Sequence, residues 1–262
     1  MNFYLLSQYL NYLWKAKNAH DLHSPFLYSF YTEVINDKVE YYCFSHLREI
    51  RKDFEKDNKK IQNIDFGAGS KKNNDTEKFI KNVARYGITR EKYARLLFRM
   101  INFFKSKNII EMGTSLGLTT LYLAKANSES KVTTFEGNPA LCQIAQDLFD
   151  QEQQKNIRVV NGNFDETLKK ELELINQIDF LFIDGNHRKD ATLRYFEMAL
   201  EKKQPHSVFV FDDIHWSKEM NEAWAAIRCH PDVTLSIDLF QFGIVFFRNE
   251  KDRKSTRLNS SH

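Results

Sequence analysis

Short apolar runs rich in isoleucine, valine and phenylalanine alternate with helical stretches through the second half of the chain. The runs expected to form strands lie at residues 108–112, 131–135, 157–160, 178–183 and 207–211. The stretches expected to form helices lie at residues 118–126, 139–150, 165–175, 189–202 and 217–228. Such alternation is typical of right-handed βαβ units, whose helices cover both faces of a parallel sheet. The pattern therefore predicts an α/β fold with five parallel strands.

The last apolar stretch has a different pattern. Residues 233–239 and 242–248 read as two strands with only Phe240 and Gln241 between them. This link is too short for a crossover helix, so the two strands should pair antiparallel. We therefore expect a seven-stranded, mostly parallel sheet with a C-terminal antiparallel hairpin. A nicotinamide-binding doubly wound domain would normally have six parallel strands instead.

The N-terminal third is helical and aromatic, and predicts a helical cap and lid region over residues 1–88, before a main domain over residues 89–251. Two of its segments imitate functional motifs. The glycine-rich stretch DFGAGS at residues 65–70 lacks a following helix and is interpreted as a cap loop. His20, Asp21 and His23 stand in a short turn before a proline, where a structural role is favoured over metal binding.

The last segment, residues 252–262, reads DRKSTRLNSSH and is polar and without periodicity. It resembles the translation of a sequencing adapter, so we expect a non-native tail in place of the natural C-terminus. It is excluded from the predicted fold.

The charge balance excludes several classes of partner. The 262 residues carry 38 basic and 35 acidic side chains, a net charge of +3, without the basic stripe of a nucleic-acid binder. The apolar stretch at residues 1–14 is broken by polar residues, which argues against a signal peptide or a membrane span. Three widely spaced cysteines argue against disulfides and zinc. We expect a cytoplasmic protein with neither nucleic-acid nor membrane partners.

A glycine turn follows the first predicted strand, within residues 108–124. Gly113 permits a tight turn, and Gly117 lets the next helix begin close to the sheet. Thr114 and Ser115 can offer hydroxyl and N–H groups to a ligand. The first strand of a doubly wound sheet ends where adenosine cofactors bind. Because the full G-x-G-x-x-G pattern is missing, the turn favours a cofactor without phosphate.

The next two strand ends carry further candidate ligands. Glu136 closes the second strand, 23 residues after Gly113 (113 to 136), where a carboxylate can accept both ribose hydroxyls. The alternative is a strand-terminal glutamate in solvent. Asn163 and Phe164 follow the third strand and could hold the adenine amino group and ring face. It is equally consistent with the sequence that Phe164 belongs to the core.

Acidic residues follow the fourth and fifth strands. Asp184 is followed by His187, and Asp212 and Asp213 follow the fifth strand. Three carboxylates at one end of a sheet repel one another unless a cation or protons neutralise them, and oxygen ligands favour Mg²⁺ or another divalent cation over zinc. His187 could act as general base. Alternatively, Asp184 contacts the amino-acid part of a cofactor and Asp213 caps the next helix.

At these positions the chain resembles class I S-adenosylmethionine-dependent methyltransferases, which have a Rossmann-like fold. The resemblance is strongest to the small-molecule O-methyltransferases related to catechol O-methyltransferase. The matching segments, all within residues 108–248 and in the family's order, are IIEMGTSLGLTT, VTTFEGNP, VVNGNFDETL, FLFIDGNH and VFVFDDIHW. The cap, residues 1–88, lies outside the resemblance.

The resemblance implies a role for each candidate residue. Those implied for the methionine end of the cofactor are Glu111, Gly113, Ser115 and Gly117. Glu136 would bind the ribose, and Asn163 with Phe164 the adenine. The metal ligands of the metal-dependent branch would fall on Asp184, Asp212 and Asp213. The chain departs from that branch in having Asp213 where catechol-type enzymes carry asparagine, and His187 at the position of the catalytic lysine.

Together these features predict an S-adenosylmethionine-dependent methyltransferase that acts on a hydroxyl of a small molecule, with Mg²⁺ or another divalent cation as an optional cofactor. Two alternatives stay open: a nicotinamide-dependent oxidoreductase, and a non-catalytic cofactor-binding protein. The sequence identifies neither the acceptor nor the oligomeric state, for which a homodimer is one option.

Overall fold

A computed structural model describes residues 3–15, 24–62, 77–248 and 254–258. These residues form two compact units, Lys38–Leu174, and Met1–Asp37 together with Ile175–His262. We refer to them as the glycine-turn unit and the acidic unit and describe each separately. These two units are not divided at residue 88, where the sequence predicts a boundary between the cap and the main domain. That boundary stays a prediction.

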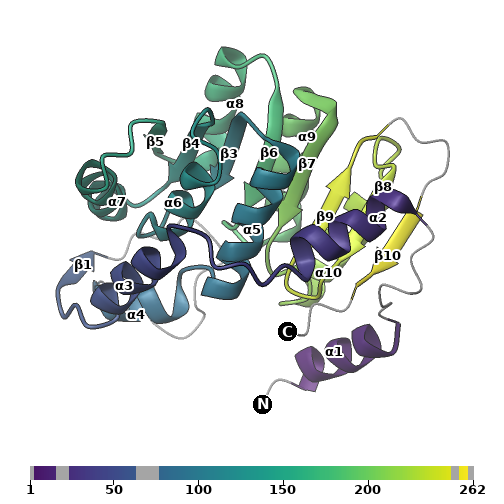
Figure 1. The fold of residues 1–262 in the computed structure, drawn as a ribbon, viewed down its shortest axis with the longest axis horizontal. Helices are drawn as coiled ribbons and strands as arrows, with labels where there is room; N and C mark the ends of the chain where they lie inside the picture. Colours follow the sequence, from purple (N-terminus) through teal and green to yellow (C-terminus); the bar gives the residue numbers. More distant parts are fainter. Residues whose placement is uncertain (1–2, 16–23, 63–76, 249–253, 259–262) are drawn as a thin grey trace. The chain divides into compact units, whose positions relative to one another are not determined.

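Three parallel strands form the sheet of the glycine-turn unit (Figure 1). They are β3 (Asn108–Met112), β4 (Lys131–Glu136) and β5 (Ile157–Asn161), with β4 paired to both of the others. Helices α6 (Leu118–Lys125), α7 (Pro139–Gln151) and α8 (Phe164–Leu174) alternate with them. Every one of these bounds lies within one residue of the sequence prediction. The βαβ interpretation of this stretch is confirmed.

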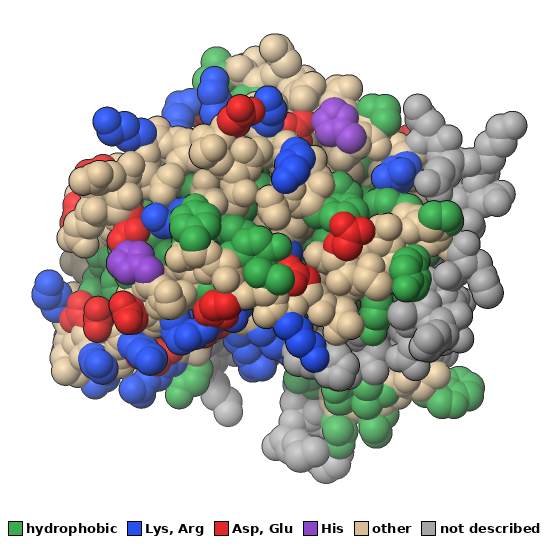
Figure 2. Space-filling model, in the orientation of Figure 1, with side chains coloured by type: hydrophobic (Ala, Val, Ile, Leu, Met, Phe, Trp, Pro, Cys, Tyr) green, Lys and Arg blue, Asp and Glu red, His purple; other side chains and the backbone are tan. Residues whose placement is uncertain are grey.

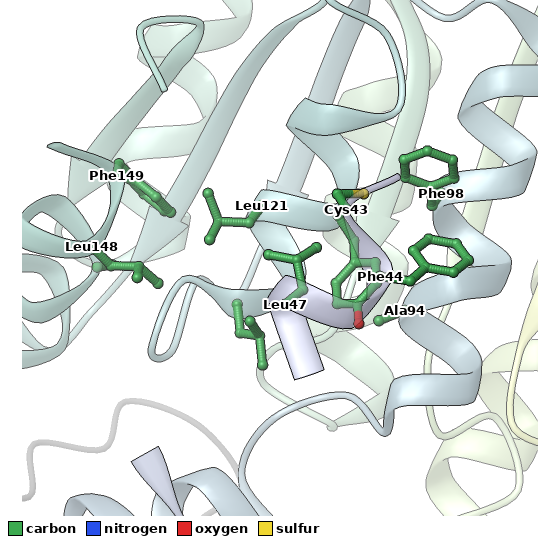
Figure 3. Packing of buried hydrophobic residues seen from close by; sticks show 11 residues of the cluster. Cys43, Phe44, Leu47, Ala94, Phe98, Leu121, Leu148 and Phe149 are labelled. Atoms are coloured by element: carbon green, nitrogen blue, oxygen red, sulfur yellow. The ribbon is translucent and has the colours of Figure 1, made fainter. Parts of the chain in front are cut away.

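Aromatic and aliphatic side chains fix the helices of this unit around α6 (Figure 3). Phe44 and Leu47 of α3 (Phe44–Phe54) pack with Phe98 of α5 (Glu91–Phe104) and Leu121 of α6 in a cluster that also includes Phe149 of α7. The Phe44 and Phe98 rings meet edge to face, with centroids 5.0 Å apart. This packing holds α6, the helix that follows the glycine turn.

A small two-stranded sheet in the glycine-turn unit was not predicted. β1 (Lys60–Gln62) pairs antiparallel with β2 (Glu77–Phe79), which leads into α4 (Ile80–Tyr86). Each strand has only three residues, none of them buried, so neither carries an apolar pattern that could be recognised in the sequence.

The acidic unit contains the remaining predicted strands. β6 (Ile178–Ile183) runs parallel to β7 (Lys203–Phe211), and β7 pairs antiparallel with β9 (Gly243–Phe246). β8 (Leu235–Asp238) pairs antiparallel with β9, which confirms the C-terminal hairpin. Helix α9 (Lys189–Leu200) connects β6 to β7, and helix α10 (Lys218–Arg228) leads from β7 to the hairpin. Every residue of β6 is buried, as expected for a continuous apolar run.

Aromatic N-terminal helices belong to this same unit: α1 (Phe3–Lys15), α2 (Pro25–Phe30) and the π-helical turn η2 (Tyr31–Ile35). Phe26 and Phe30 both lie edge-on to Phe246 of β9, with ring centroids 5.3 and 5.8 Å away. The aromatic helices predicted at the N-terminus are therefore present, whereas a cap over residues 1–88 stays a prediction. Within the described residues, no helix combines the length and the apolar character that a membrane crossing needs.

One further strand lies inside the segment expected to be a non-native tail. β10 (Lys254–Arg257) pairs in parallel with β8. Backbone pairing explains this without a sequence pattern, because the edge of a sheet presents unpaired N–H and C=O groups to any extended segment. The non-native origin of residues 252–262 stays a prediction.

Candidate functional site

The glycine turn between β3 and α6 has the backbone that its sequence predicts. Gly113 and Gly117 have φ angles of 111° and 80°, in the region that favours glycine. A Cβ atom at Gly117 would lie 2.8 Å from the Phe149 ring. Glycine is therefore required there both for the turn and for the close approach of α6 to α7.

Glu136 holds this turn from the end of β4. Its Oε2 accepts a hydrogen bond from the Ser115 N–H at 2.9 Å, and its Oε1 accepts one from the Asn138 N–H at 2.8 Å. Each carboxylate oxygen can accept more than one hydrogen bond, so these two bonds alone do not use all the acceptor positions of Glu136. The structure thus brings Glu136 and Ser115 together, the pairing on which the cofactor prediction depends.

Glu111 lies fully buried beneath the turn. Its Oε2 accepts hydrogen bonds from the hydroxyls of Thr120 at 2.5 Å and Thr134 at 2.7 Å, whereas its Oε1 has no partner among the described residues. Burial raises the pKa of Glu111 to about 7, against the opposing effect of the two threonine bonds. Glu111 is therefore held inside the protein, and a role in cofactor binding stays a prediction.

Thr114 is also turned inward. Its hydroxyl shares a 2.6 Å hydrogen bond with that of Thr134, and the residue is buried. The Thr114 N–H, like that of Gly113, donates to the carbonyl of Phe135, at 3.1 Å. The hydroxyl expected to face a ligand instead belongs to the internal network around Glu111.

Asn163 and Phe164 mark the start of α8 after β5. The side-chain oxygen of Asn163 accepts from the Asp165 N–H at 3.1 Å, which is a helix-capping arrangement. Phe164 is half-buried and lies edge-on to Phe135, with ring centroids 6.5 Å apart. Both alternatives, adenine binding and a core position, are consistent with this placement.

Three carboxylates influence one another at the carboxyl ends of β6 and β7. Asp184 follows β6, and Asp212 and Asp213 follow β7, whose last residues pair in register with those of β6. The pKa of buried Asp212 is raised well above its usual value, first by burial and then by the charges of Asp184 and Asp213. The crowding inferred from the sequence is therefore a property of the structure.

Gln241, which the sequence analysis did not assign a function, lies against two of these acids. Its Nε2 is 2.5 Å from Asp212 Oδ1 and 2.6 Å from Asp213 Oδ1. Asp212 Oδ1 also accepts the Asp213 N–H at 2.7 Å. The only sequence signal for Gln241 was its place in the two-residue link of the predicted hairpin.

His187 lies close to Asp184, as expected of a residue three positions later. Its Nε2 is 3.6 Å from Asp184 Oδ1, and the side chains are 28% and 18% exposed. The pair is thus accessible to a ligand, unlike buried Asp212. This arrangement is compatible with a general base that a carboxylate orients.

As arranged, the facing Oδ1 atoms of Asp212 and Asp213 do not fit a divalent cation. Asp212 Oδ1 accepts two hydrogen bonds, from the Asp213 N–H and from Gln241 Nε2, and the same Gln241 nitrogen contacts Asp213 Oδ1. No three His, Cys, Asp or Glu side chains in the described parts of the chain are grouped to hold a metal ion. The metal-ligand assignment of Asp184, Asp212 and Asp213 stays a prediction.

Two motifs that the sequence analysis interpreted as structural fall outside the described residues. They are the His20, Asp21 and His23 turn and the DFGAGS segment at residues 65–70.

Comparison with known proteins finds similarity to methyltransferases. Residues 110–214 match the family described as "Methyltransferase domain". The catechol O-methyltransferase of Niastella koreensis is 27% identical over 126 residues, which are 47% of this chain and 55% of that one. The chain therefore spans about half the length of this curated relative.

Solved structures share the fold at low sequence identity. An SAH-bound methyltransferase from Podospora anserina has a TM-score of 0.61 at 12% identity, covering 87% of this chain and 97% of that one. An O-methyltransferase from Bacillus cereus in complex with SAH has a TM-score of 0.57 at 17% identity, covering 83% and 96%. Residues 110–214 thus match a methyltransferase domain, and the chain shares with these solved methyltransferases the Rossmann-like fold that its sequence predicts.

Proposed function

We propose that this protein uses S-adenosylmethionine to methylate a hydroxyl group of a small molecule. The observation that carries the proposal is the position of Glu136, whose carboxylate holds the N–H of the glycine turn at the end of the neighbouring strand. The match of residues 110–214 to a methyltransferase domain supports it, as do relatives whose names include O-methyltransferase.

The glycine-turn unit would hold the donor. We assign the ribose hydroxyls to Glu136, the methionine end to the backbone at Gly113, Ser115 and Gly117, and the adenine to Asn163 and Phe164. Ser115 has a positive φ of 49°, which orients its N–H toward Glu136. No pyrophosphate loop is required, because this donor carries no phosphate.

The acidic unit would prepare the acceptor. The donor supplies a sulfonium whose positive charge disappears on methyl transfer, so the protein must mainly orient the acceptor and remove its proton. We assign that proton to Nδ1 of His187, because Nε2 is turned to Asp184. The Asp184 carboxylate would stabilise the imidazolium that results. No step is routed through a cation.

We also propose that the acceptor is a small molecule and that the protein is cytoplasmic. Acidic and basic side chains are intermixed over the face shown in Figure 2, which supports a small acceptor rather than a polyanion. Cys43, Cys142 and Cys229 are all free thiols, which supports a reducing compartment such as the cytoplasm.

Calorimetry with S-adenosylhomocysteine tests the donor assignment. We expect wild-type protein to bind it, and Glu136→Ala to bind it about 10- to 100-fold more weakly, the cost of losing charge-assisted hydrogen bonds. Glu129→Ala is the matched control, because the Glu129 side chain is exposed and forms an ion pair with Lys107, which is also exposed.

Three other outcomes would redirect the assignment. Failure of wild-type protein to bind S-adenosylhomocysteine contradicts the proposal, and binding of NAD alone identifies an oxidoreductase. Binding without methyl transfer to any member of a panel of hydroxylated metabolites identifies a non-catalytic cofactor-binding protein.

A further inference from the structure

The side-chain amide of Gln241 bridges two carboxylates in the acidic unit. Its nitrogen lies 2.5 Å from Asp212 Oδ1 and 2.6 Å from Asp213 Oδ1. An NH₂ group carries two hydrogens, one for each acceptor, whereas the amide oxygen in that place would face two acceptors without a hydrogen between them. The bridge therefore fixes the orientation of the amide.

This bridge uses the atoms that a divalent cation would need. Asp212 Oδ1 accepts hydrogen bonds both from Gln241 and from the Asp213 N–H at 2.7 Å. A carboxylate oxygen with both lone pairs engaged is a poor ligand until one partner leaves. A neutral amide attracts the two acids less strongly than a cation does, but it is covalently attached to the chain and is easier to dehydrate than a divalent cation.

Several contacts hold Gln241 in this place. Asp238, at the end of β8, accepts the Phe240 N–H at 2.9 Å and pairs with His215 Nε2 at 3.0 Å. His215 and Asp238 are each only 4% exposed, so this pairing is sheltered from water. The Phe240 ring also stacks on His215, with centroids 5.2 Å apart. These contacts secure Phe240 at a φ of 68°, and Gln241 is the next residue.

We infer that Gln241 is a positioning residue that holds Asp212 and Asp213 together and keeps divalent cations from binding to the pair. The inference rests on the proposed function only in that the acidic unit is assigned to the acceptor. Its test measures cation binding rather than methyl transfer, so the two can fail independently.

Mn²⁺ binding to the chelator-treated full chain tests the inference, by calorimetry and by the loss of the free-ion electron paramagnetic resonance signal. We expect Gln241→Ala to bind Mn²⁺ at least about tenfold more tightly than wild type, because Asp212 and Asp213 recover their free lone pairs. Gln241→Met, which keeps the length of the side chain without a donor, makes the same comparison if the alanine variant does not fold.

Two further variants locate the effect. Gln143→Ala is the matched control, since Gln143 Nε2 also donates to an aspartate, Asp147 Oδ1, at 2.7 Å on an exposed helix face; it should bind Mn²⁺ as wild type does. Adding Asp213→Asn to Gln241→Ala should abolish the gain. Equal Mn²⁺ affinity in wild type and Gln241→Ala, binding in neither, or a gain that survives Asp213→Asn would each overturn the inference.

Discussion

Both units have polar turns at the carboxyl ends of parallel strands, but different kinds of residue occupy the positive φ angles in these turns. In the glycine-turn unit, glycines take two of the positive φ angles, at Gly113 and Gly117, and backbone N–H groups bind Glu136. In the acidic unit, Asn186, Asp213 and Phe240 take positive φ angles without being glycine. The glycine turn places one non-glycine residue, Ser115, at a positive φ angle, whereas the turns of the acidic unit place three there.

A buried carboxyl in each unit shows the same contrast. The pKa of Glu111 is raised mainly by burial, and two threonine hydroxyls oppose the change. The pKa of Asp212 is raised by burial and also by the neighbouring acids Asp184 and Asp213. The difference suggests that the glycine turn is stabilised by its own contacts, while the acidic turn accepts a cost in stability where side chains must remain available for chemistry.

The largest expected effect concerns Glu111. Folding raises its pKa from 4.5 to about 7, so its stabilising contribution is complete below pH 4.5 and is lost as the pH rises through 7. Over that range we expect wild type to lose about 3 kcal/mol of unfolding free energy relative to Glu111→Gln, which cannot ionise. Urea unfolding of both proteins across this range measures the difference. Parallel pH profiles would show that Glu111 is not held in the neutral form.

A smaller effect is expected at the glycine turn. Gly117→Ala places a methyl group against the Phe149 ring at a φ of 80°, and should lower the free energy of unfolding by about 2 kcal/mol. Gly87→Ala is the control, because Gly87 has a negative φ of −116°. If thermal and urea unfolding show the same loss for both variants, the turn does not require glycine in the way described.

The smallest effect, of opposite sign, is expected at the acidic turn. Asp213→Asn keeps an acceptor for Gln241 but removes a charge beside Asp212, so the pKa of Asp212 should fall and stability above neutral pH should rise by about 1 kcal/mol. Carbon-13 NMR of the Asp212 carboxyl and urea unfolding measure the two changes. Asp147→Asn, at an exposed aspartate that also accepts from a glutamine, should change neither.

The sequence predicted the strands and helices around both turns because apolar periodicity is a local signal. It predicted Glu136 for a similar reason, since the end of a strand and the spacing from Gly113 are visible in one dimension. It gave no role to Gln241, whose contacts with Asp212 and Asp213 depend on how the hairpin is aligned beside β7. The sequence also offered the Thr114 hydroxyl to a ligand. Its hydrogen bond to Thr134 could not be predicted, because that bond forms only when β3 and β4 pair.

The pairing of β10 with β8 has a practical consequence for handling this protein. A chain that stopped before residue 254 would leave one side of β8 without a hydrogen-bonded neighbour, along Leu235–Asp238, a strand buried at every position. Exposed strand edges of this kind recruit extended segments from other molecules. Removing the final residues is therefore expected to favour self-association and strand exchange, even though those residues lie far in sequence from the glycine turn.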